Sequence, residues 1–512
     1  MTATPRAERP SVRRLGPTLL VLLCAAPIVA WLLAVPLDDR FAGSFAALTS
    51  LAVLCAYAGT SAFALNLVVG ARLRVVERLF GGLDRMYRVH RRTGEAAFAL
   101  LLGHVALVVA GRATLSADTA LDLLGPAAGL TVFAGVLAFA AMSVAIGLTL
   151  FARLGHEVFV YVQRSFGFVF LLATYHALTT DGTTHDSGLL TGYLTVLATA
   201  GIAAFAYRSV LGSVLVRRRR YCVRAVNRLD DVVTEIVMEP AGKPLEHAAG
   251  QFVFVSFPSL DLRALELSLE SQVLAIRAGE VRGQFHPFSI TSAPGEETLR
   301  ITVKALGDYT RALRRLEEGA DALVEGPFGS FSHESVAGRR QIWAAGGIGV
   351  TPFLGMARSL RPDDRVSVDF YYCVEHEAEA HFLDELQAIA RSREDVRVTL
   401  VARERDGFLT AKRIAAEVGD LATAEVLVCG PPAMIESLRS QLVAEGVARN
   451  RFHAEEFSFA NVGHSSRTSD DRPRPPLEPR RGVSDGQLIA VLSGLAFTAV
   501  VFAIGVAIGG SL

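Results

Sequence analysis

Three histidines lie in apolar stretches of the chain, where an imidazole has few ordinary uses. His90 and His104 share the stretch LDRMYRVHRRTGEAAFALLLGHVALVV, and His176 lies near one end of FVYVQRSFGFVFLLATYHAL. On an ideal helix, His90 and His104 would lie about 21 Å apart along the axis and within about 40° of one face. A single histidine in a membrane-length segment is more often packed than metal-bound, but two on one face favour two stacked haem levels.

A glycine-rich turn follows a predicted strand in IWAAGGIGVTPFLGMARSL. The candidate nucleotide-binding residues of this stretch are Gly346, Gly347, Gly349, Val350, Thr351 and Pro352. The strand is predicted to end at Ala345, with Thr351 as the N-cap and Pro352 as the first residue of the next helix. Glycine lets backbone amides approach a pyrophosphate, and the helix N-terminus adds about half a positive charge. A glycine-rich turn without a ligand has the same pattern, so this turn alone does not establish a nucleotide site.

A second turn further along the chain supports the nucleotide interpretation. VLVCGPPAMIESL indicates a strand, a turn with Cys429, Gly430 and Pro431, and a helix. The carboxyl ends of parallel strands share one edge of an open α/β sheet, and ligands bind at that edge. We therefore expect Cys429 and Gly430 to lie beside the first glycine turn.

A strand with alternating hydroxyl groups precedes both turns, in GQFHPFSITSAPGEETLRITVKALGDYTRAL. Its side chains include hydroxyls at Ser289, Thr291 and Ser292, an aromatic ring at Phe288 and an imidazole at His286. For Ser289 or Thr291 alone, ordinary strand packing explains the residue as well as a role in binding does.

The composition indicates a membrane protein with a large soluble part. Of the 512 residues, 51% are hydrophobic and 20% are charged, and the charges lie mainly after residue 216. The apolar runs before that point approach the roughly 20 residues that cross a bilayer. A formal net charge of zero argues against nucleic acid as a partner. The five cysteines form no CxxC, which argues against a zinc ribbon, a disulfide framework and an iron–sulfur cluster.

Six apolar segments are predicted to span the lipid bilayer. They cover residues 15–35, 42–70, 93–111, 127–152, 158–179 and 188–216. Arginines gather on one side of these segments, whereas the alternate loops carry only Arg40 and Arg112. The positive-inside rule then places the soluble part in the cytoplasm, below a multi-pass domain of the plasma membrane.

The predicted fold class is a multi-domain membrane protein. The expected parts are a cytoplasmic tail (1–14), a six-helix transmembrane bundle (15–217), a β-barrel domain (218–332), an α/β domain with a parallel sheet (333–459), a linker (460–485) and a C-terminal transmembrane helix (486–512).

Five ordered motifs give the chain a specific resemblance. HPFSITSAP, GDYT, GPFG, GGIGVTP and CGPP follow one another in this order, and the stretch 221–459 resembles the FAD and NAD(P)H lobes of the ferredoxin-reductase superfamily. The stretch is most similar to the membrane branch of that superfamily, the ferric reductases and NADPH oxidases. The resemblance implies an NAD(P)H-dependent oxidoreductase with FAD and haem b as cofactors.

The resemblance also implies roles for individual residues. FAD would be held by His286, Pro287, Phe288, Ser289, Thr291, Ser292, Gly307 and Thr310, with Phe457 or Phe459 covering the flavin. Either phenylalanine could equally be a core residue. The nicotinamide nucleotide would lie on Gly346 to Pro352 and on Cys429, Gly430 and Pro431. Cys429 and Ser289 are the candidate catalytic residues.

In the family pattern, each histidine of the third helix pairs with one on the fifth, and each pair holds a b-type haem. His104 then pairs with His176, but the expected partner of His90 is Gln163, which is a poor ligand for haem iron. Three interpretations are open: His90 holds a haem with a weak or missing sixth ligand, His156 substitutes for Gln163, or this haem is absent. We expect one haem between His104 and His176 and an altered second level.

Glu375 bears on the choice of coenzyme. NADPH-using members of the family commonly carry an arginine near this position to hold the 2′-phosphate. An acid suits a free ribose 2′-hydroxyl better, which favours NADH. The insertion at 259–283 has no assigned function.

The predicted function is electron transfer from cytoplasmic NAD(P)H through FAD and haem to an acceptor at the outer face. The acceptor would be a ferric chelate, dioxygen or a redox protein partner, and Asp181, His185 and Asp186 form either a dock for ferric iron or a solvated loop. The alternatives are a dedicated superoxide producer, a membrane-anchored flavin reductase with a degenerate haem path that serves a cytoplasmic or quinone acceptor, and a non-enzymatic haem-binding subunit.

Overall fold

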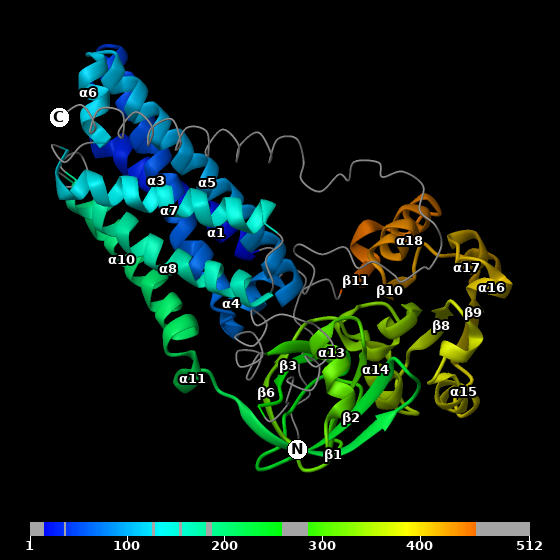
Figure 1. The fold of residues 1–512 in the computed structure, drawn as a ribbon. Helices are drawn as coiled ribbons and strands as arrows, with labels where there is room; N and C mark the ends of the chain where they lie inside the picture. Colours follow the sequence, from blue (N-terminus) through cyan, green and yellow to red (C-terminus); the bar gives the residue numbers. More distant parts are fainter. Residues whose placement is uncertain are drawn as a thin grey trace, which may run out of the picture. The chain divides into compact units, whose positions relative to one another are not determined.

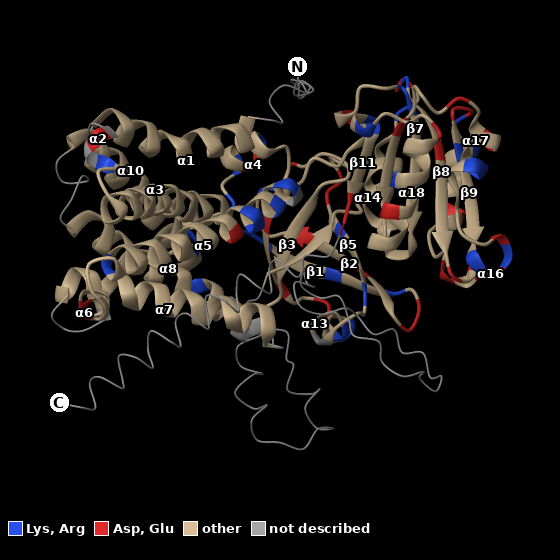
Figure 2. Cartoon of the chain, turned by 90° about the horizontal axis from the view of Figure 1, so that it is seen from above, with Lys and Arg blue, Asp and Glu red and all other residues tan. Residues whose placement is uncertain are grey.

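The computed structural model describes residues 15–34, 37–124, 128–152, 156–180, 187–258 and 285–456. These residues form two compact units, a helical one up to Val216 and one with two sheets from Arg217 onward, apart from Gly82–Asp84, which group with the second unit (Figure 1). Figure 2 shows that the long helices are mostly uncharged, whereas Lys, Arg, Asp and Glu are scattered over the sheets. The shift in composition along the sequence therefore coincides with the division into units.

Long helices make up most of the first unit. They are α1 (Leu15–Ala34), α3 (Ser44–Gly70), α5 (Leu83–Ala113), α7 (Gly129–Phe151), α8 (His156–Thr179) and α10 (Gly188–Phe205). Shorter helices are α2 (Leu37–Arg40), α4 (Arg74–Phe80) and α6 (Ala117–Leu121). Five segments, in α1, α3, α5, α7 and in α10 with the turn after it, are long and apolar enough to cross a membrane. The remaining long helix, α8, carries Gln163 and Arg164 within its apolar sequence.

Two helix boundaries differ from the sequence prediction. α5 begins at Leu83 rather than at residue 93, because its first turns carry Arg85, Arg88 and Arg91 and a charged helix start escapes a search for apolar runs. The last predicted segment is not one continuous helix. α10 ends at Phe205, a π-helical turn covers Ala206–Val210, and α11 spans Gly212–Leu215. The amide of Leu211 donates to the carbonyl of Ala206, which is the wider spacing of a π-turn.

An antiparallel sheet of six strands begins the second unit. Its strands are β1 (Arg219–Arg228), β2 (Val233–Pro240), β3 (Phe252–Ser256), β4 (His286–Ser289), β5 (Leu299–Lys304) and β6 (Asp321–Phe328), in the order β4-β3-β6-β1-β2-β5. A bridge between Ile290 and Ile301 joins the residue after β4 to β5, so the two ends of the sheet meet. Apolar side chains such as Tyr221, Val253 and Phe288 form its core, and helix α13 (Asp308–Ala312) follows β5.

A parallel sheet of five strands follows, as the sequence predicts. Its strands are β7 (Arg340–Gly346), β8 (Ser367–Val374), β9 (Val396–Ala402), β10 (Glu425–Cys429) and β11 (Phe452–Glu455), in the order β11-β10-β7-β8-β9. Its helices are α14 (Thr351–Ser359), α15 (Leu383–Arg391), α16 (Arg403–Asp406), α17 (Ala411–Val418) and α18 (Pro432–Ala444).

Alternate residues of the parallel strands enter two separate cores. Trp343 packs with Phe353 and Phe370, whereas its neighbour Ile342 packs in the other core with Tyr371. Side chains of a strand alternate between faces, so both faces of this sheet are buried. The strand order reverses between β7 and β10, and the crevice at the carboxyl ends of such a pair is where open α/β sheets bind ligands.

Several predicted features lie outside the described residues. They are the tail at 1–14, the loop with Asp181, His185 and Asp186, the insertion at 259–283, Phe457 and Phe459, the linker, and the C-terminal helix at 486–512.

Candidate redox-cofactor sites

His104 of α5 and His176 of α8 pack against each other inside the helical unit. Their ring centroids are 6.3 Å apart and the ring planes are tilted by 58°. An imidazole nitrogen binds a metal at about 2.0 Å and lies about 1.1 Å from its ring centre, so one metal between two rings separates the centroids by about 6.2 Å. The spacing of the pair would therefore suit one iron held by both histidines, as in a b-type haem.

Backbone carbonyl groups fix both rings through nitrogen Nδ1. The Nδ1 atom of His104 lies 2.9 Å from the carbonyl oxygen of Ala52 in α3, and that of His176 lies 3.0 Å from the carbonyl oxygen of Thr131 in α7. A carbonyl oxygen only accepts, so each Nδ1 carries the proton and each Nε2 keeps a lone pair for a metal. Metal-binding histidines usually have such a partner on the second nitrogen.

A glycine on α7 makes room for the His176 ring. A Cβ atom at Gly135 would lie 2.8 Å from both Cγ and Nδ1 of His176, which is closer than real Cβ contacts. The ring thus occupies space that any other residue at this position would fill.

The ring of His90 also lies beside a backbone carbonyl group and a glycine. Its Nδ1 atom lies 3.1 Å from the carbonyl oxygen of Asn66 in α3, and a Cβ atom at Gly70 would lie 3.2 Å from its Cε1 atom. The separation between Ala52 and Asn66 (66 − 52 = 14) equals that between His90 and His104 (104 − 90 = 14). α3 therefore supplies a carbonyl group to each histidine of the antiparallel helix α5.

The opposite side of the His90 level is different. Gln163, at the position that the family pattern gives to a histidine, is a partly buried residue of α8. The side chain of His156, the substitute considered from the sequence, lies outside the described residues. The structure thus shows His104 and His176 in contact with each other. For His90 it shows the contacts with α3.

The strand β4 and the residues after it carry the predicted FAD contacts. Phe288 and Ser289 are buried beside β3, where Ser289 pairs with Phe252. The hydroxyl groups of Ser289 and Thr291 are buried, and neither has a hydrogen-bond partner among the described residues. A buried hydroxyl without a partner costs free energy, so a polar ligand that reaches these atoms would bind favourably. These residues therefore fit a flavin cofactor.

Other predicted FAD residues have partners within the protein. The ring of His286 stacks on that of Tyr309 with centroids 3.7 Å apart, next to the partly exposed Pro287. The hydroxyl of Ser292 accepts from the amide of Arg300 at 3.2 Å.

The turn before α13 is also held by hydrogen bonds within the turn. The Thr310 hydroxyl accepts from the amides of Leu306 and Gly307, each at 2.9 Å. Binding of a pyrophosphate to the amide of Gly307 would therefore replace this bond.

Only one glycine of the predicted coenzyme turn faces open space. Gly347 has φ +55°, and a Cβ atom there would meet nothing within 4 Å. A Cβ atom at Gly346 would come within 2.7 Å of Cδ of Pro431, and one at Gly349 within 2.3 Å of the carbonyl oxygen of Cys429. Two of the three glycines are therefore required because the GGIG and CGPP turns pack together, which confirms that both turns share one edge of the sheet.

The predicted N-cap of α14 is wrong. Gly347–Val350 form a 3-10 turn that continues into the helix, so Val350 is the capping residue and makes no side-chain cap. The Thr351 hydroxyl instead donates to the carbonyl oxygen of Ile348 at 3.0 Å. Pro352 does lie in the first turn of the helix, as predicted.

Cys429 lies at the end of β10, paired with Glu455 of β11. Burial raises the pKa of the Cys429 thiol well above its usual value, and the nearby Glu455 carboxylate raises it further. The thiol is therefore neutral near pH 7. Glu455 could not be singled out from the sequence, because its pairing with Cys429 arises only when β10 and β11 meet in the sheet.

Acidic and basic residues pair at the ends of β8 and β9. Nη1 of Arg403 donates to both oxygens of Glu375, at 3.0 and 2.9 Å, and Arg405 donates to Glu377 at 2.8 Å. Sequence reasoning missed both arginines, since they follow a different strand from Glu375. The predicted ribose-binding acid is thus already paired with a cation.

A cavity beside Gly347 is lined by residues of both sheets. The lining consists of Asp230, Val233, Lys304, Gly347, Ile348, Val350, Tyr372, Glu379, His381 and Phe382. His381 lies 2.7 Å from Asp230, and Lys304 lies 3.6 Å from Glu379. The open glycine of the coenzyme turn therefore borders a cavity whose lining joins the two sheets.

Three family models match successive parts of the chain. A ferric reductase like transmembrane component matches residues 55–174, an FAD-binding domain matches residues 274–332, and an oxidoreductase NAD-binding domain matches residues 344–440.

Three curated relatives each match less than half of this chain. The chain is 28% identical to NADPH oxidase 1 of Mus musculus over 187 residues, which is 32% of this chain and 28% of the relative. It is 27% identical to the mitochondrial ferric reduction oxidase 8 of Arabidopsis thaliana over 227 residues, which is 42% of this chain and 26% of the relative. It is 29% identical to ferredoxin–NADP reductase B of Sorangium cellulosum over 252 residues, which is 46% of this chain and 95% of the relative. The chain thus spans only about a quarter of the two oxidases.

Proposed function

Since this chain is a membrane oxidoreductase similar to ferric reductases and NADPH oxidases, with FAD- and NAD-binding domains, we propose that it carries electrons from NAD(P)H through FAD to haem b. From the haem, the electrons pass to an acceptor at the outer face of the plasma membrane, and the FAD and NAD(P) domains lie in the cytoplasm.

When bound, FAD would supply hydride acceptance from a nicotinamide and release of single electrons, and haem iron would supply a one-electron carrier. In this proposal His104 and His176 hold the iron, and their Nδ1 bonds to carbonyl groups keep both rings oriented. The buried hydroxyls of Ser289 and Thr291, which have no hydrogen-bond partner in the part of the chain that the structure describes, bind polar edges of the flavin. Cys429 contributes a neutral, buried thiol beside the coenzyme turn.

The observation that carries the haem proposal is the 6.3 Å separation of the two imidazole rings. Two neutral histidines pressed together in an apolar bundle gain little from each other, whereas a metal between them uses both lone pairs. We propose one haem at this level and an altered or absent haem at His90, because Gln163 replaces the expected ligand.

The coenzyme in this proposal is NADH. Glu375, at the carboxyl end of the strand next to β7, is suited to accept a hydrogen bond from a ribose 2′-hydroxyl. Its pairing with Arg403 also neutralises the cation that a 2′-phosphate would need. We expect a higher kcat/KM for NADH than for NADPH, and Glu375→Gln should narrow this preference by releasing Arg403.

Several finer features of the fold belong to the same proposal. We propose that the antiparallel sheet closes as the β-barrel of an FAD domain at 218–332, that an NAD(P) domain covers 333–459, and that six helices and a C-terminal helix span the membrane. The Ile290–Ile301 bridge supports the closed barrel.

The test uses the full-length protein purified in detergent. We expect flavin and haem absorbance, equal molar amounts of flavin and haem, and anaerobic reduction of both by NADH. Absence of flavin would overturn the proposal. Flavin that NADH reduces without haem reduction would favour a membrane-anchored flavin reductase, and an oxygen-dependent product removed by superoxide dismutase would identify a superoxide producer.

A further inference from the structure

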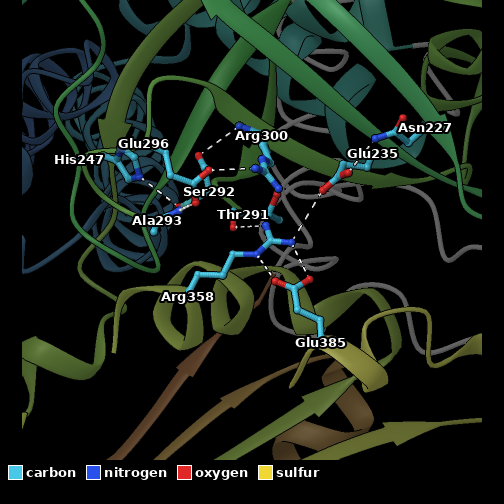
Figure 3. Close-up of polar contacts among 10 residues, drawn as sticks. All are labelled: Asn227, Glu235, His247, Thr291, Ser292, Ala293, Glu296, Arg300, Arg358 and Glu385. Atoms are coloured by element: carbon cyan, nitrogen blue, oxygen red, sulfur yellow. Dashed lines mark hydrogen bonds and ion pairs between the residues drawn. The ribbon is translucent and has the colours of Figure 1, made fainter. Parts of the chain in front are cut away.

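Arg358 connects the two sheets of the second unit through one buried guanidinium group. It lies in the last turn of α14, and its side chain is only 10% exposed. It donates to both oxygens of Glu385 in α15, at 2.6 and 2.9 Å, and to the backbone carbonyl of Thr291 at 2.6 Å. Figure 3 shows this guanidinium between Thr291, Glu235 and Glu385.

The charges around Arg358 hold it in place from both sides. Glu235 of β2 lies 4.0 Å from Arg358, and its second oxygen accepts from Asn227 at 3.0 Å. The Arg358 hydrogen bond lowers the pKa of Glu385, so this pair stays charged at neutral pH. A buried cation between two carboxylates with charge-assisted bonds has a well-defined position.

Thr291 is constrained at two of its polar groups and unconstrained at the third. Its carbonyl accepts from Arg358, and its amide donates to the carbonyl of Arg300 at 2.9 Å. Its hydroxyl is buried, has no hydrogen-bond partner among residues 285–456 or the other described ranges, and is the group that we assign to the flavin. Arg358 therefore fixes the backbone of a residue whose side chain would bind FAD.

A second contact between α14 and this segment is independent of Arg358. A Cβ atom at Gly355 would lie 2.8 Å from the carbonyl oxygen of Ile290 and 3.3 Å from that of Ser292. The backbone of α14 therefore packs directly on residues 290–292, and Arg358 binds the same segment one turn further along the helix.

The other end of α14 begins at the coenzyme turn. The helix covers nine residues, which is about 12 Å from its first to its last residue. A helix this short behaves as one rigid element, because every residue in it is held by the same hydrogen-bond ladder. One element thus carries the GGIG turn at its start and grips the flavin-binding segment at its end.

We propose that Arg358 is a positioning residue that sets the place of the flavin relative to the coenzyme turn by holding Thr291 against α14. This inference rests on the proposed function, since it requires FAD at Ser289 and Thr291. Loss of Arg358 should weaken FAD binding and slow flavin reduction, while the binding of NADH changes little.

Arg393 provides a matched control. Its side chain is also buried, at 7% exposed, and donates to both oxygens of Asp395, at 2.9 and 2.6 Å. It further donates to the carbonyl groups of Arg361 and Asp364, so its partners all belong to the parallel-sheet part of the unit. Arg393→Gln removes a comparable buried cluster that does not touch residues 289–292.

The experiment compares the full-length wild type, Arg358→Gln and Arg393→Gln in detergent. The readouts are the Kd for FAD, from the fluorescence of released flavin, and the rate of flavin reduction at saturating NADH, from stopped-flow absorbance. We expect Arg358→Gln to weaken FAD binding and slow reduction by about tenfold or more each, as a hydrogen bond to a charged group is worth at least this factor. The apparent Kd for NADH should change less than about threefold, and Arg393→Gln should leave both flavin readouts within about twofold.

Equal effects of Arg358→Gln and Arg393→Gln on the flavin readouts would overturn the proposal, since Arg358 would then have a merely structural role. A rise only in the Kd for NADH would overturn it too. If Arg358→Gln does not fold, Glu385→Gln replaces it, because this variant keeps the bond from Arg358 to Thr291 but removes the carboxylate that holds the guanidinium. We expect weaker FAD binding and slower flavin reduction in Glu385→Gln, each by a smaller factor. Wild-type values of both flavin readouts in Glu385→Gln would contradict the proposal. A wild type without FAD would instead refute the proposed function.

Discussion

The two histidine levels of α5 share one side and differ on the other. On the α3 side, His104 and His90 each have an Nδ1 bond to a backbone carbonyl, at 2.9 and 3.1 Å. On the α8 side, His104 meets the imidazole of His176, whereas the family pattern matches His90 with the amide of Gln163. Orientation of a ligand and completion of a metal site are thus separate features: the structure shows an oriented ring at both histidines and a second imidazole beside His104.

The largest effect should come from removing one imidazole of the His104–His176 pair. His176→Ala should abolish the haem held with His104 and lower NADH-driven haem reduction by more than about 100-fold, since altering only the outer partners of metal ligands already costs about 10–100-fold. Haem content by pyridine haemochrome assay and stopped-flow absorbance measure this. The matched variant is His90→Ala, which should keep the haem. Equal losses of haem in His176→Ala and His90→Ala would contradict the proposed difference between the His104 and His90 sites.

A histidine at position 163 should make the site at His90 resemble the site at His104. Gln163→His should roughly double the ratio of haem to flavin, because it supplies the second histidine that the family pattern pairs with His90. The control Gln163→Ala should leave the ratio unchanged. If the wild type already carries two haems and Gln163→His adds none, the His90 level is complete as it stands.

Crowding the His176 ring should weaken haem binding by His104 and His176 without removing either imidazole. In Gly135→Ala the added methyl group lies 2.8 Å from the ring, so the imidazole must tilt or move. We expect haem binding to weaken by about tenfold, the lower end of the cost of misoriented ligands, together with a shifted Soret band. Gly192→Ala serves as the control, because a Cβ atom there meets nothing within 4 Å. An unchanged spectrum in Gly135→Ala would contradict the assigned ring position.

The smallest effect should come from the equivalent change at the His90 level. A Cβ atom at Gly70 lies 3.2 Å from Cε1 of His90, which a small shift relieves. If no haem depends on His90, Gly70→Ala should leave haem content and spectrum unchanged. A spectral change like that of Gly135→Ala would show that His90 also binds a haem.

The helical part of the fold follows from apolar runs, except where charge interrupts them. The segments predicted at 15–35, 42–70 and 127–152 lie within one or two residues of α1, α3 and α7. The first turns of α5 lie outside the apolar segment predicted at 93–111, because an arginine-rich helix end has the same composition as a loop. The π-turn at Ala206–Val210 was missed as well, because an apolar run does not reveal how its backbone is hydrogen-bonded.

The candidate sites show a similar division. The strand and turn that carry Ser289, Gly347 and Cys429 could be recognised from local motifs. The Arg358 cluster could not, because its members lie far apart in the sequence and meet only after folding. The roles of individual glycines also could not be assigned, since Gly346 and Gly349 are needed for packing and only Gly347 faces open space.

The carbonyl groups that α3 presents to α5 have a consequence for how these sites change over evolution. The acceptors at Ala52 and Asn66 belong to the main chain, so no replacement of either side chain removes them. The orientation of both imidazoles is therefore inherited from the helical shape of α3 rather than from the identity of its residues. α3 can vary in sequence while both rings keep their direction, and each histidine of α5 stays oriented whether or not a second ligand lies opposite it.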